Sequence, residues 1–552
     1  MILDEQIEEV LADCRNILKH NPYHAQAHVT IGNIMRLKND FVAALVAYHT
    51  AIDLDASLLE AYINLAGILI YQKKYKQAID TIQKALFYHT ESPELYLNLG
   101  LAFKLDGDWV MATEMYEKAI TLRPYWAEAY YNLAGVLKRQ NRIEEAIVAY
   151  QTTLAIKPDW AEAYNDFGIL LQYNNQLEKA YQMYSKAVAL KPLWPISTYN
   201  LAKLAIKQGW IEQAIEWLRK TIAIEPDFSP AHVDLALLLL QQGNYIEGWK
   251  EYEWRLNDHN YAIYRKMSGM PLWDGTALNG RTLLLWSEQG LGDTLQFVRY
   301  ISLIQKEGGT IILQVPQLLV LLLKNLVGVD QVIPNSEPIN GFDVHCSLFS
   351  LPRIFGTTLE NIPSVVPYLQ SPSSFSPELY MTIVDESSFK IGIVWKSGNK
   401  YINHQWRDCD LSYFQRLTKI KNVKLFSMQV GEDQKELLNS PGQKISNLAC
   451  YIDHFASTAA IVEHMDLIIT VDTAMAHLAG GLGKKVWLLL NASADWRWML
   501  WGNYSPWYPT MRLFRQSQPG DWTSVFDQIT QLLNETSTLG NEAQISNLSK
   551  CQ

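Results

Sequence analysis

Residues 127–160 read AEAYYNLAGVLKRQNRIEEAIVAYQTTLAIKPDW, and this pattern recurs along the first half of the chain. Each copy has a small residue at its eighth position and another at its twentieth, and four copies have proline at the thirty-second. Small residues let two helices approach closely, while proline ends the second helix. The copies follow one another every 34 residues without insertion or deletion, starting at Ala25, Leu59, Pro93, Ala127, Ala161, Pro195 and Ser229. The sequence therefore predicts seven helix pairs in register, with half a repeat before them in residues 1–24.

The 34-residue period and its small residues resemble the tetratricopeptide repeat. One helix pair cannot bury its apolar face alone, so neighbouring pairs should stack into an α-solenoid. We expect this superhelix to occupy residues 1–262. The last repeat ends in YIEGWKEYEWRL (245–256), where bulky aromatic residues indicate docking onto the domain that follows.

The sixth position of each repeat is usually asparagine, and it should fall on one line along a regular stack. The seven residues are Thr30, Asn64, Asn98, Asn132, Asp166, Asn200 and Asp234. An amide side chain both donates and accepts hydrogen bonds, so a row of them can bind a peptide backbone whatever its side chains. The row resembles the asparagine ladder of the protein O-GlcNAc transferases, which implies that Asn64, Asn98, Asn132 and Asn200 hold an acceptor polypeptide. Packing between repeats would explain the same recurrence, and the sequence leaves both interpretations open.

Composition excludes several classes of protein. The 552 residues are 48% hydrophobic and 19% charged, which excludes a disordered or fibrous chain. The formal net charge of -10 argues against a general nucleic-acid-binding protein. The five cysteines are odd in number and far apart, as expected in a reducing compartment. The chain begins without a basic, apolar leader and has no apolar run long enough to span a bilayer, so we expect a cytoplasmic protein; a peripheral membrane role stays open.

From Arg281 the pattern changes to short apolar runs that alternate with helical segments. Continuous apolar strands between helices are typical of a parallel sheet covered on both faces. The runs are residues 281–286, 310–315, 390–395, 423–428, 466–471 and 485–490. A Ser- and Pro-rich linker (371–380) divides them into two α/β subdomains, 263–380 and 381–535, and residues 536–552 are expected to form a flexible tail. Two such subdomains predict a ligand cleft at the carboxyl ends of their strands.

The first loop that could carry chemistry is SEQGLGDTLQF (287–297). It follows a strand and opens an apolar helix, with Asp293 at the helix start. It lacks the lysine of a phosphate-binding Walker loop and the third glycine of a dinucleotide fingerprint. Asp293 is therefore a candidate functional carboxylate, and plain helix capping is the competing interpretation.

The second loop, VDTAMAHLAG (471–480), also joins a strand to a helix. Asp472, Thr473 and Ala474 stand where free helix N–H groups favour phosphate. His477 lies one turn inside the helix and could face the same ligand. A histidine buried in the core is the competing interpretation.

The third loop, VWKSGNKYINHQWRDC (394–409), combines a strand end with glycine and cations. Lys396, Ser397, Gly398 and Arg407 suit a diphosphate, since cations beside a glycine turn bind phosphate oxygens. A solvated loop is the alternative.

Together these loops resemble the heptosyltransferase-like glycosyltransferases of the GT-B type, which have two Rossmann-like subdomains. Gly292 and Asp293 match the Gly-Asp motif of that family's first subdomain. Asp472, Thr473 and His477 match the Asp-Thr/Ser-x-x-x-His motif of the second, although Ala474 replaces the usual glycine. The chain is also similar to bacterial tetratricopeptide proteins with a heptosyltransferase-like C-terminal domain, through the phrases EYEWR (251–255), QGLGDTLQFVRY (289–300), DTAMAHLAGGLGKKVW (472–487), DWRW (495–498) and PWYP (506–509).

The resemblance implies transfer of a sugar from a nucleotide sugar, with Asp293 as general base. It implies that Thr473 and Ala474 hold the leaving diphosphate, which Arg407 or Lys396 neutralises. The further donor contacts that it implies are Gln429, Glu436 and Arg497. It implies neither a metal ion nor another cofactor, and Asp408-Cys409-Asp410 is better interpreted as helix capping than as a metal site.

The leading hypothesis is thus an α-solenoid of tetratricopeptide repeats followed by a GT-B glycosyltransferase, whose acceptor is a polypeptide held by the repeats. The alternatives are a protein-interaction scaffold with an inactive or nucleotide-binding transferase domain, and an enzyme that acts on a glycan or lipid. Exposed repeat ends could support a homodimer.

Overall fold

The computed structural model describes residues 2–257, 267, 269–339, 341–372, 377–383, 388–398, 407–438 and 444–538. Contacts within the chain divide it into two compact units, Met1–Pro226 and Asp227–Gln552. The boundary expected at residue 262 and most of the expected tail, from residue 539 on, lie outside the described residues. No helix among the described residues has the length and apolar character needed to cross a membrane.

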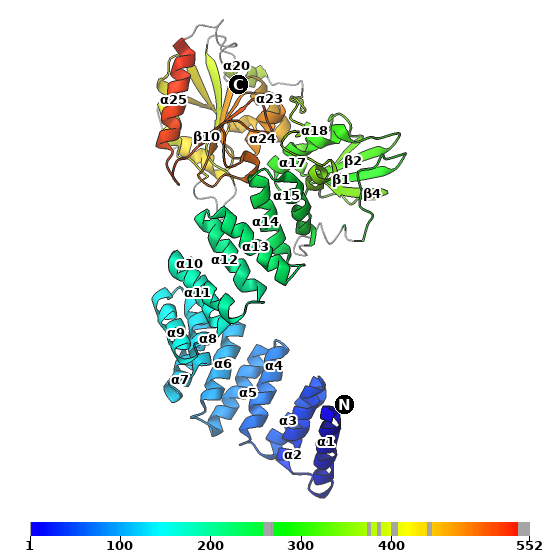
Figure 1. Ribbon diagram of the computed structural model, residues 1–552, viewed down its shortest axis with the longest axis vertical. Coiled ribbons are helices and arrows are strands. Elements are labelled where there is room, and N and C mark those ends of the chain that lie inside the picture. Colours follow the sequence, from blue (N-terminus) through cyan, green and yellow to red (C-terminus); the bar gives the residue numbers. More distant parts are fainter. Residues whose placement is uncertain are drawn as a thin grey trace. The chain divides into compact units, whose positions relative to one another are not determined.

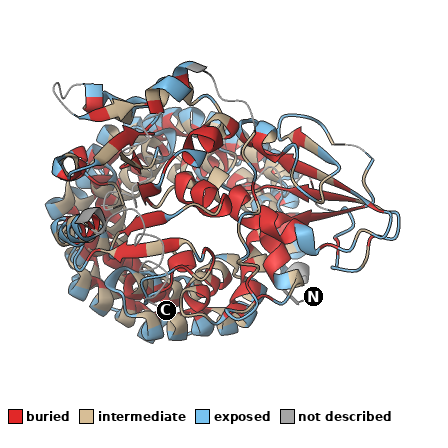
Figure 2. Cartoon of the chain, turned by 90° about the horizontal axis from the view of Figure 1, so that it is seen from above, coloured by how far each residue is buried: buried red, intermediate tan, exposed pale blue. Residues whose placement is uncertain are grey.

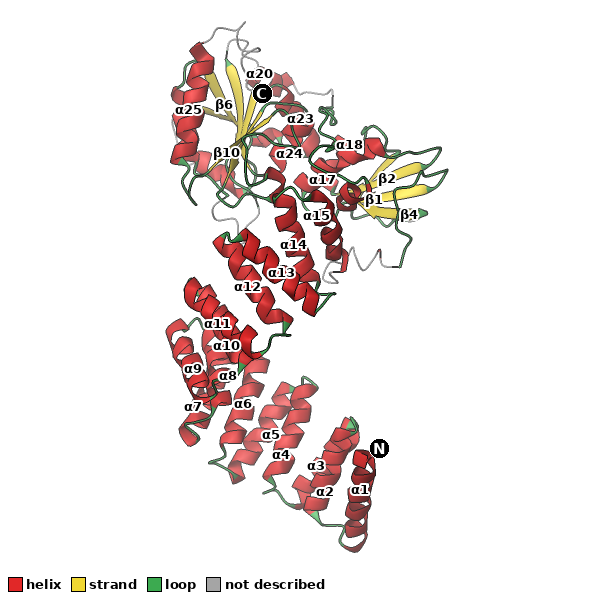
Figure 3. Ribbon diagram, in the orientation of Figure 1, coloured by secondary structure: helices red, strands yellow, loops and turns green. Residues whose placement is uncertain are grey.

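The first unit is a row of helices (Figures 1 and 3). α1 (Ile2–His20) precedes six pairs, and the first helix of every pair begins at the predicted start of a repeat. The pairs are α2 (Ala25–Leu37) and α3 (Phe41–Leu54), α4 (Leu59–Tyr71) and α5 (Tyr75–Tyr88), α6 (Pro93–Asp106) and α7 (Trp109–Leu122), α8 (Ala127–Arg139) and α9 (Ile143–Ile156), α10 (Ala161–Tyr173) and α11 (Leu177–Leu190), and α12 (Pro195–Gln208) and α13 (Ile211–Ile224). The predicted helical repeats are confirmed.

Close packing within a pair depends on the small residue at the eighth position. A Cβ atom added to Gly32, Gly100 or Gly168 would lie 2.6 Å from the ring of the tyrosine at the twenty-fourth position of the same repeat. These tyrosines are Tyr48, Tyr116 and Tyr184, and all three are buried. Glycine therefore makes room for an aromatic side chain that fills the interior of the pair.

The turn inside each pair places the fifteenth residue of the repeat in the left-handed region. The residues, with their φ values, are Asn39 (59°), Lys73 (61°), Gly107 (92°), Asn141 (61°), Asn175 (56°), Gly209 (73°) and Gly243 (82°). Glycine and asparagine tolerate this conformation, which ends a helix. Lys73 is the one residue of the series that is neither glycine nor asparagine, so the backbone of its turn is strained.

The second unit begins with the seventh pair, α14 (Ser229–Gln241) and α15 (Tyr245–Tyr252), which η1 (Glu253–Asn257) continues. Two parallel sheets follow. The four-stranded sheet has the order β3-β2-β1-β4 and comprises β1 (Thr282–Trp286), β2 (Thr310–Val315), β3 (Gln331–Pro334) and β4 (Val344–Ser347). The six-stranded sheet has the order β10-β9-β8-β5-β6-β7 and comprises β5 (Phe389–Val394), β6 (Val423–Ser427), β7 (Ile445–Asn447), β8 (Leu467–Val471), β9 (Val486–Leu490) and β10 (Met511–Arg515).

The six predicted strands correspond to β1, β2, β5, β6, β8 and β9, each within one residue of its expected bounds. The helices around the sheets are α17 (Leu291–Phe297), η2 (Val298–Leu303), α18 (Gln317–Leu323), η3 (Leu348–Ser350), α19 (Leu351–Ile354), α20 (Pro377–Ile383), α21 (Leu411–Gln415), η5 (Arg416–Lys419), η6 (Glu432–Gln434), α22 (Lys435–Leu438), η7 (Ala449–Tyr451), α23 (Phe455–Glu463), α24 (Ala474–Gly481), η8 (Trp496–Trp498) and α25 (Thr523–Thr538).

β8 and β9 are buried along their whole length. Figure 2, which colours buried residues red, shows red along most of the strand arrows. On one face of the six-stranded sheet, Ile391 belongs to the same apolar cluster as Phe414 of α21 and Phe526 of α25. On the other face, Ile468 clusters with residues of α23 and α24, including Leu478. Burial on both faces explains why these strands are continuous apolar runs in the sequence.

The seventh pair packs against the α/β part of its own unit. Trp249 of α15 lies edge-on to Trp496, with ring centroids 5.2 Å apart, and is also edge-on to Phe297 at 6.1 Å. Gln241 of α14 donates a hydrogen bond to the carbonyl oxygen of Ala494 (3.1 Å). The aromatic residues at the end of this repeat thus dock on the following region, as the sequence predicts.

Candidate functional site

The helices that follow β1 and β8 meet at their N-terminal ends. A Cβ atom added to Gly292 of α17 would lie 2.7 Å from His477 Cδ2 and 3.2 Å from Ala474 Cα in α24. Any larger residue at position 292 would force the His477 ring and the α24 backbone to shift, so glycine permits the close approach. The approach brings the predicted loops at 287–297 and 471–480 to one place.

Asp293 sits in the first turn of α17 at this meeting point. Its Oδ2 accepts a hydrogen bond from the Gly290 N–H (2.8 Å), and its Oδ1 accepts one from Arg497 (2.5 Å). Burial raises the pKa of Asp293 above its ordinary value, and Arg497 partly opposes that rise. Asp293 therefore caps its helix, as the simpler interpretation expects, and is also a basic carboxylate beside a cation.

Arg497 organises the charges of the site. Its guanidinium, which is buried, donates to Asp293, to Asp495 (2.8 Å) and to the side-chain oxygen of Gln296 (2.6 Å). Its Cζ also lies 4.4 Å from the ring centroid of Trp496, a cation–π contact. The sequence singled out Arg497 but missed Asp495 and Gln296, although both fall in the phrases DWRW and QGLGDTLQFVRY.

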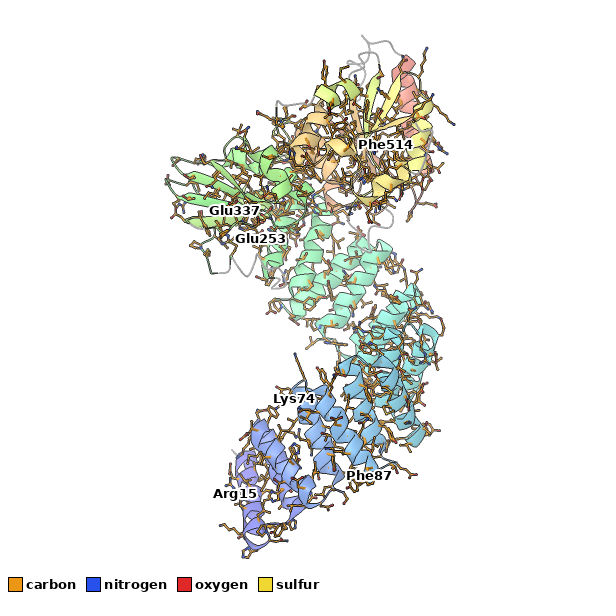
Figure 4. All side chains as sticks on the ribbon, turned by 180° about the vertical axis from the view of Figure 1, so that it is seen from behind. Arg15, Lys74, Phe87, Glu253, Glu337 and Phe514 are labelled. Carbon is orange, nitrogen blue, oxygen red and sulfur yellow. The ribbon has the colours of Figure 1, made fainter. Side chains whose placement is uncertain are left out.

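A buried ion pair fixes the loop that precedes Asp293. Arg255 of η1 makes two hydrogen bonds to Glu288, of 3.0 Å and 2.8 Å, and the Glu288 side chain has no exposed surface. Ser347, the last residue of β4, also donates to Glu288. Glu253, labelled in Figure 4, accepts a third hydrogen bond from Arg255 (2.9 Å). Sequence reasoning missed this cluster, for which the phrase EYEWR was the available signal.

Asp472 lies at the end of β8, just before α24. Arg407 donates a hydrogen bond to it (3.2 Å), and burial raises its pKa against the effect of that arginine. The hydroxyl of Thr473 caps α24 by accepting a hydrogen bond from the Met475 N–H (3.3 Å). The structure thus brings Asp472, Thr473, Ala474 and Arg407 together at one helix N-terminus, which favours anions.

His477 is buried one turn inside α24. Its Nδ1 is 2.9 Å from the Tyr508 hydroxyl, and its ring stacks on Trp498 with centroids 5.4 Å apart. Burial and the nearby Arg497, Arg299 and Arg407 hold its pKa well below the ordinary value, so the imidazole is neutral at pH 7. Burial in the core and proximity to the site, posed as alternatives by the sequence, are both true of His477.

Apart from Arg407, which reaches Asp472, the candidate residues of the third loop cluster at the ends of β5 and β6. Gln429 is buried and accepts hydrogen bonds from the N–H groups of Trp395 (3.1 Å) and Lys396 (3.0 Å). Lys396 pairs with Glu436, which also accepts from the Trp395 indole (3.0 Å). These side chains hold the loop in shape.

The other two candidate residues of that loop are Ser397 and Gly398. Ser397 donates twice to Asp408, through its N–H (2.9 Å) and its hydroxyl (3.1 Å). A Cβ on Gly398 would meet nothing within 4 Å. Asp410 caps α21 by accepting from the Ser412 N–H (2.8 Å), as the capping interpretation predicts. Residues 399–406 lie outside the described part of the chain.

The ladder asparagines belong to the first unit, and most of them bond within it. Asn64 donates to Asn33 of the preceding repeat (2.8 Å), and Asn200 donates to Asn165 (2.7 Å). The Asn132 amide donates to the Glu128 carbonyl oxygen (2.9 Å). Among the described residues, the Asn98 side chain alone of the four ladder asparagines forms no hydrogen bond. Packing between repeats therefore accounts for Asn64 and Asn200.

Comparisons with known proteins agree with the helical part. Models of the tetratricopeptide repeat match residues 59–86, 105–166 and 197–228, so the chain contains tetratricopeptide repeats, a scaffold suited to protein–protein interaction. Protein FlbA of Caulobacter vibrioides (strain ATCC 19089 / CIP 103742 / CB 15) is 24% identical over 321 residues, covering 53% of this chain and 53% of FlbA. The chain thus spans about half the length of that curated relative.

Two solved structures match part of this chain. MamA is 27% identical over 30% of this chain and 92% of its own, with a TM-score of 0.29. YrrB, a tetratricopeptide protein with an unusual peptide-binding site, is 24% identical over 33% of this chain and 95% of its own, with a TM-score of 0.30.

Proposed function

We propose that the second unit is a glycosyltransferase of the GT-B type, and that the repeats hold a polypeptide acceptor. The observation that carries the proposal is the approach of Gly292 to α24. It joins a basic carboxylate, Asp293, to a helix N-terminus that carries Asp472, Thr473 and a nearby arginine. A base beside an anion-binding helix end suits attack on a sugar with departure of a diphosphate.

In the proposed reaction an acceptor oxygen bonds to the anomeric carbon while the bond from that carbon to the diphosphate breaks. The acceptor proton passes to Asp293. Each carboxylate oxygen of Asp293 accepts one hydrogen bond and keeps a second lone pair for this proton. Burial raises the Asp293 pKa, which makes the carboxylate a stronger base than an exposed aspartate.

The leaving diphosphate gains negative charge as the bond breaks. The first turn of α24 and Arg407 would stabilise that charge, since Thr473 caps the helix and Asp472 holds Arg407 beside it. Neutral His477, one turn inside the helix, adds a ring nitrogen without adding a charge. Nucleotide contacts would come from the Lys396–Ser397–Gly398 loop together with Gln429 and Glu436.

The scaffold alternative has its own supporting observation. The charged groups of the site are already neutralised by one another, because Arg497 pairs with Asp293 and Lys396 pairs with Glu436. Such pairs would persist in a domain that has lost catalysis and serves only to support the repeats.

Release of nucleoside diphosphate from a bound nucleotide sugar distinguishes a transferase from a scaffold. Asp293→Asn should leave nucleotide binding within about twofold of wild type and abolish release of nucleoside diphosphate from a nucleotide sugar. Asp527→Asn, at an exposed surface pair, is the matched control and should retain activity. Equal turnover by Asp293→Asn and wild type would refute the role of Asp293, and nucleotide binding without turnover in wild type would favour the scaffold.

A further inference from the structure

Tyr508 has a fixed place beside His477 in the second unit. Its ring packs where α24 has a glycine, because a Cβ atom added to Gly480 would lie 2.4 Å from Tyr508 Cδ1. Gly480 follows His477 by three residues, so the two lie on one side of the helix. The Tyr508 hydroxyl thereby reaches His477 Nδ1 at 2.9 Å, and both side chains are buried.

The other edge of the His477 ring faces the candidate site. A Cβ atom added to Gly292 of α17 would lie 2.7 Å from His477 Cδ2 and 3.5 Å from its Nε2. Trp498 stacks on the ring and holds its plane. Within the described part of the chain, the contact with Tyr508 is the one hydrogen bond of the imidazole. Whether Nε2 presents a proton or a lone pair therefore depends on the tautomer that Tyr508 selects.

Both groups are neutral at pH 7, so only the positions of their protons need to be assigned. Burial and nearby arginines hold the pKa of His477 well below its ordinary value, and burial holds the pKa of Tyr508 well above its own. The phenol thus keeps its one proton, and the imidazole carries one. Either Tyr508 donates to Nδ1, or a protonated Nδ1 donates to Tyr508.

A neighbouring tyrosine decides between these arrangements. Tyr368 donates its proton to the carbonyl oxygen of Leu295 (2.9 Å) and accepts a hydrogen bond from Arg299 (3.1 Å), which can only donate. Tyr368 therefore has no proton to give to Tyr508. The Tyr508 proton can go to the Tyr368 oxygen at 3.5 Å or to His477 Nδ1 at 2.9 Å, and the shorter distance makes the better hydrogen bond. Arg299, with its Cζ 4.5 Å from the Tyr508 ring centroid, also favours donation by the phenol.

We infer that Tyr508 is a positioning residue that fixes His477 in the tautomer with its proton on Nε2, so that the edge of the ring facing the site is a hydrogen-bond donor. The inference rests on the proposed function, since the Nε2–H group would bond an oxygen of the bound nucleoside diphosphate near the first turn of α24. A lone pair at Nε2 would repel that oxygen. Tyr508 acts through His477 and does not itself contact the ligand.

Nitrogen NMR of the full chain with ¹⁵N-labelled histidine tests the inference, because protonated and unprotonated ring nitrogens give well-separated signals. His477→Gln identifies the signals of His477, and in wild type its Nε2 should carry the proton. Tyr508→Phe keeps the ring beside Gly480 but removes the hydroxyl. It should shift the tautomer ratio towards Nδ1–H by about fivefold, which is the equilibrium weight of one buried hydrogen bond.

Tyr368→Phe is the matched control. It removes a buried-network hydroxyl with two hydrogen bonds and should leave the His477 tautomer unchanged, so general loosening of the network is separated from loss of the Tyr508 donor. Nucleoside diphosphate binding should weaken about two- to fivefold in Tyr508→Phe, since only the Nε2–H form is competent.

Three results would overturn the inference: a proton on Nδ1 in wild type, a tautomer ratio that Tyr508→Phe leaves unchanged, or an equal shift in Tyr368→Phe. If Tyr508→Phe melts early, wild type grown with fluorotyrosine replaces it. The more acidic phenol should then move the His477 Nδ1 signal, and an unmoved signal would count against the inference. The tautomer is measured without nucleotide, so failure of wild type to bind any nucleotide would refute the proposed transferase separately from the role of Tyr508.

Discussion

Replacing Arg255 with methionine should destabilise the second unit by about 3–5 kcal/mol, because it leaves a buried carboxylate without its cation. Glu288 has no exposed side-chain surface and receives two hydrogen bonds from Arg255. Methionine fills similar volume but cannot donate. Glu253 would keep Arg353 (3.3 Å) and Ser350 (2.9 Å) as partners. The lost free energy of unfolding therefore comes mainly from the unpaired Glu288 carboxylate.

Chemical and thermal denaturation measure this effect. The melting temperature of the transition that belongs to the second unit should fall on the order of 10 °C. Glu288→Gln alone should cost less, because Arg255 keeps Glu253. The double variant Arg255→Met/Glu288→Gln should recover at least about 1 kcal/mol relative to Arg255→Met, since glutamine buries no charge beside Ser347. A loss below about 1 kcal/mol for Arg255→Met, or no recovery in the double variant, would refute the reasoning.

Three further changes test other parts of the structure. Gly292→Ala should abolish nucleotide binding or cost about 1–3 kcal/mol of unfolding free energy, since its Cβ would meet the Ala474 backbone. Gly135→Ala, where an added Cβ meets nothing within 4 Å, should neither destabilise the protein nor weaken nucleotide binding; equal effects of the two changes would contradict the helix approach. Lys73→Gly should raise the stability of the first unit by about 1 kcal/mol in urea titration, because it relieves a left-handed lysine, and an unchanged midpoint would count against that strain. Because His477 has a lowered pKa and stays neutral when folded, stability should fall as the pH drops below about 6.5, by up to about 1.4 kcal/mol per pH unit, and His477→Gln should reduce that slope; an identical pH profile would disprove the assignment.

The repeats could be predicted to the residue because every copy repeats the same local physics. The start of each first helix follows from the position of the small residues and from the 34-residue step between copies. The strands were similarly predictable where burial on both faces made them continuous apolar runs, as in β8. β10 escaped prediction because its sequence, MRLFR, places arginines among its apolar residues.

The site was less accessible to sequence reasoning, because its contacts join distant segments. Arg497 and Asp293 lie 204 residues apart, and no spacing rule links them. Glu288 and Arg255 are closer in sequence, yet their pairing depends on how α15 docks. Gln429 resembles a ligand contact in the sequence, whereas in the structure it accepts hydrogen bonds from the N–H groups of the two residues that follow β5. Residue type identified candidates, and only the fold showed which side chains already have partners.

Calorimetric titration of the full chain with a panel of nucleoside diphosphates and their sugars is the most direct test of the central claim. The account predicts that one nucleotide class binds with micromolar affinity, that Arg407→Gln weakens it, and that Asp293→Asn leaves it unchanged. Absence of binding at millimolar concentration by a folded preparation would contradict the claim that the second unit holds a sugar donor.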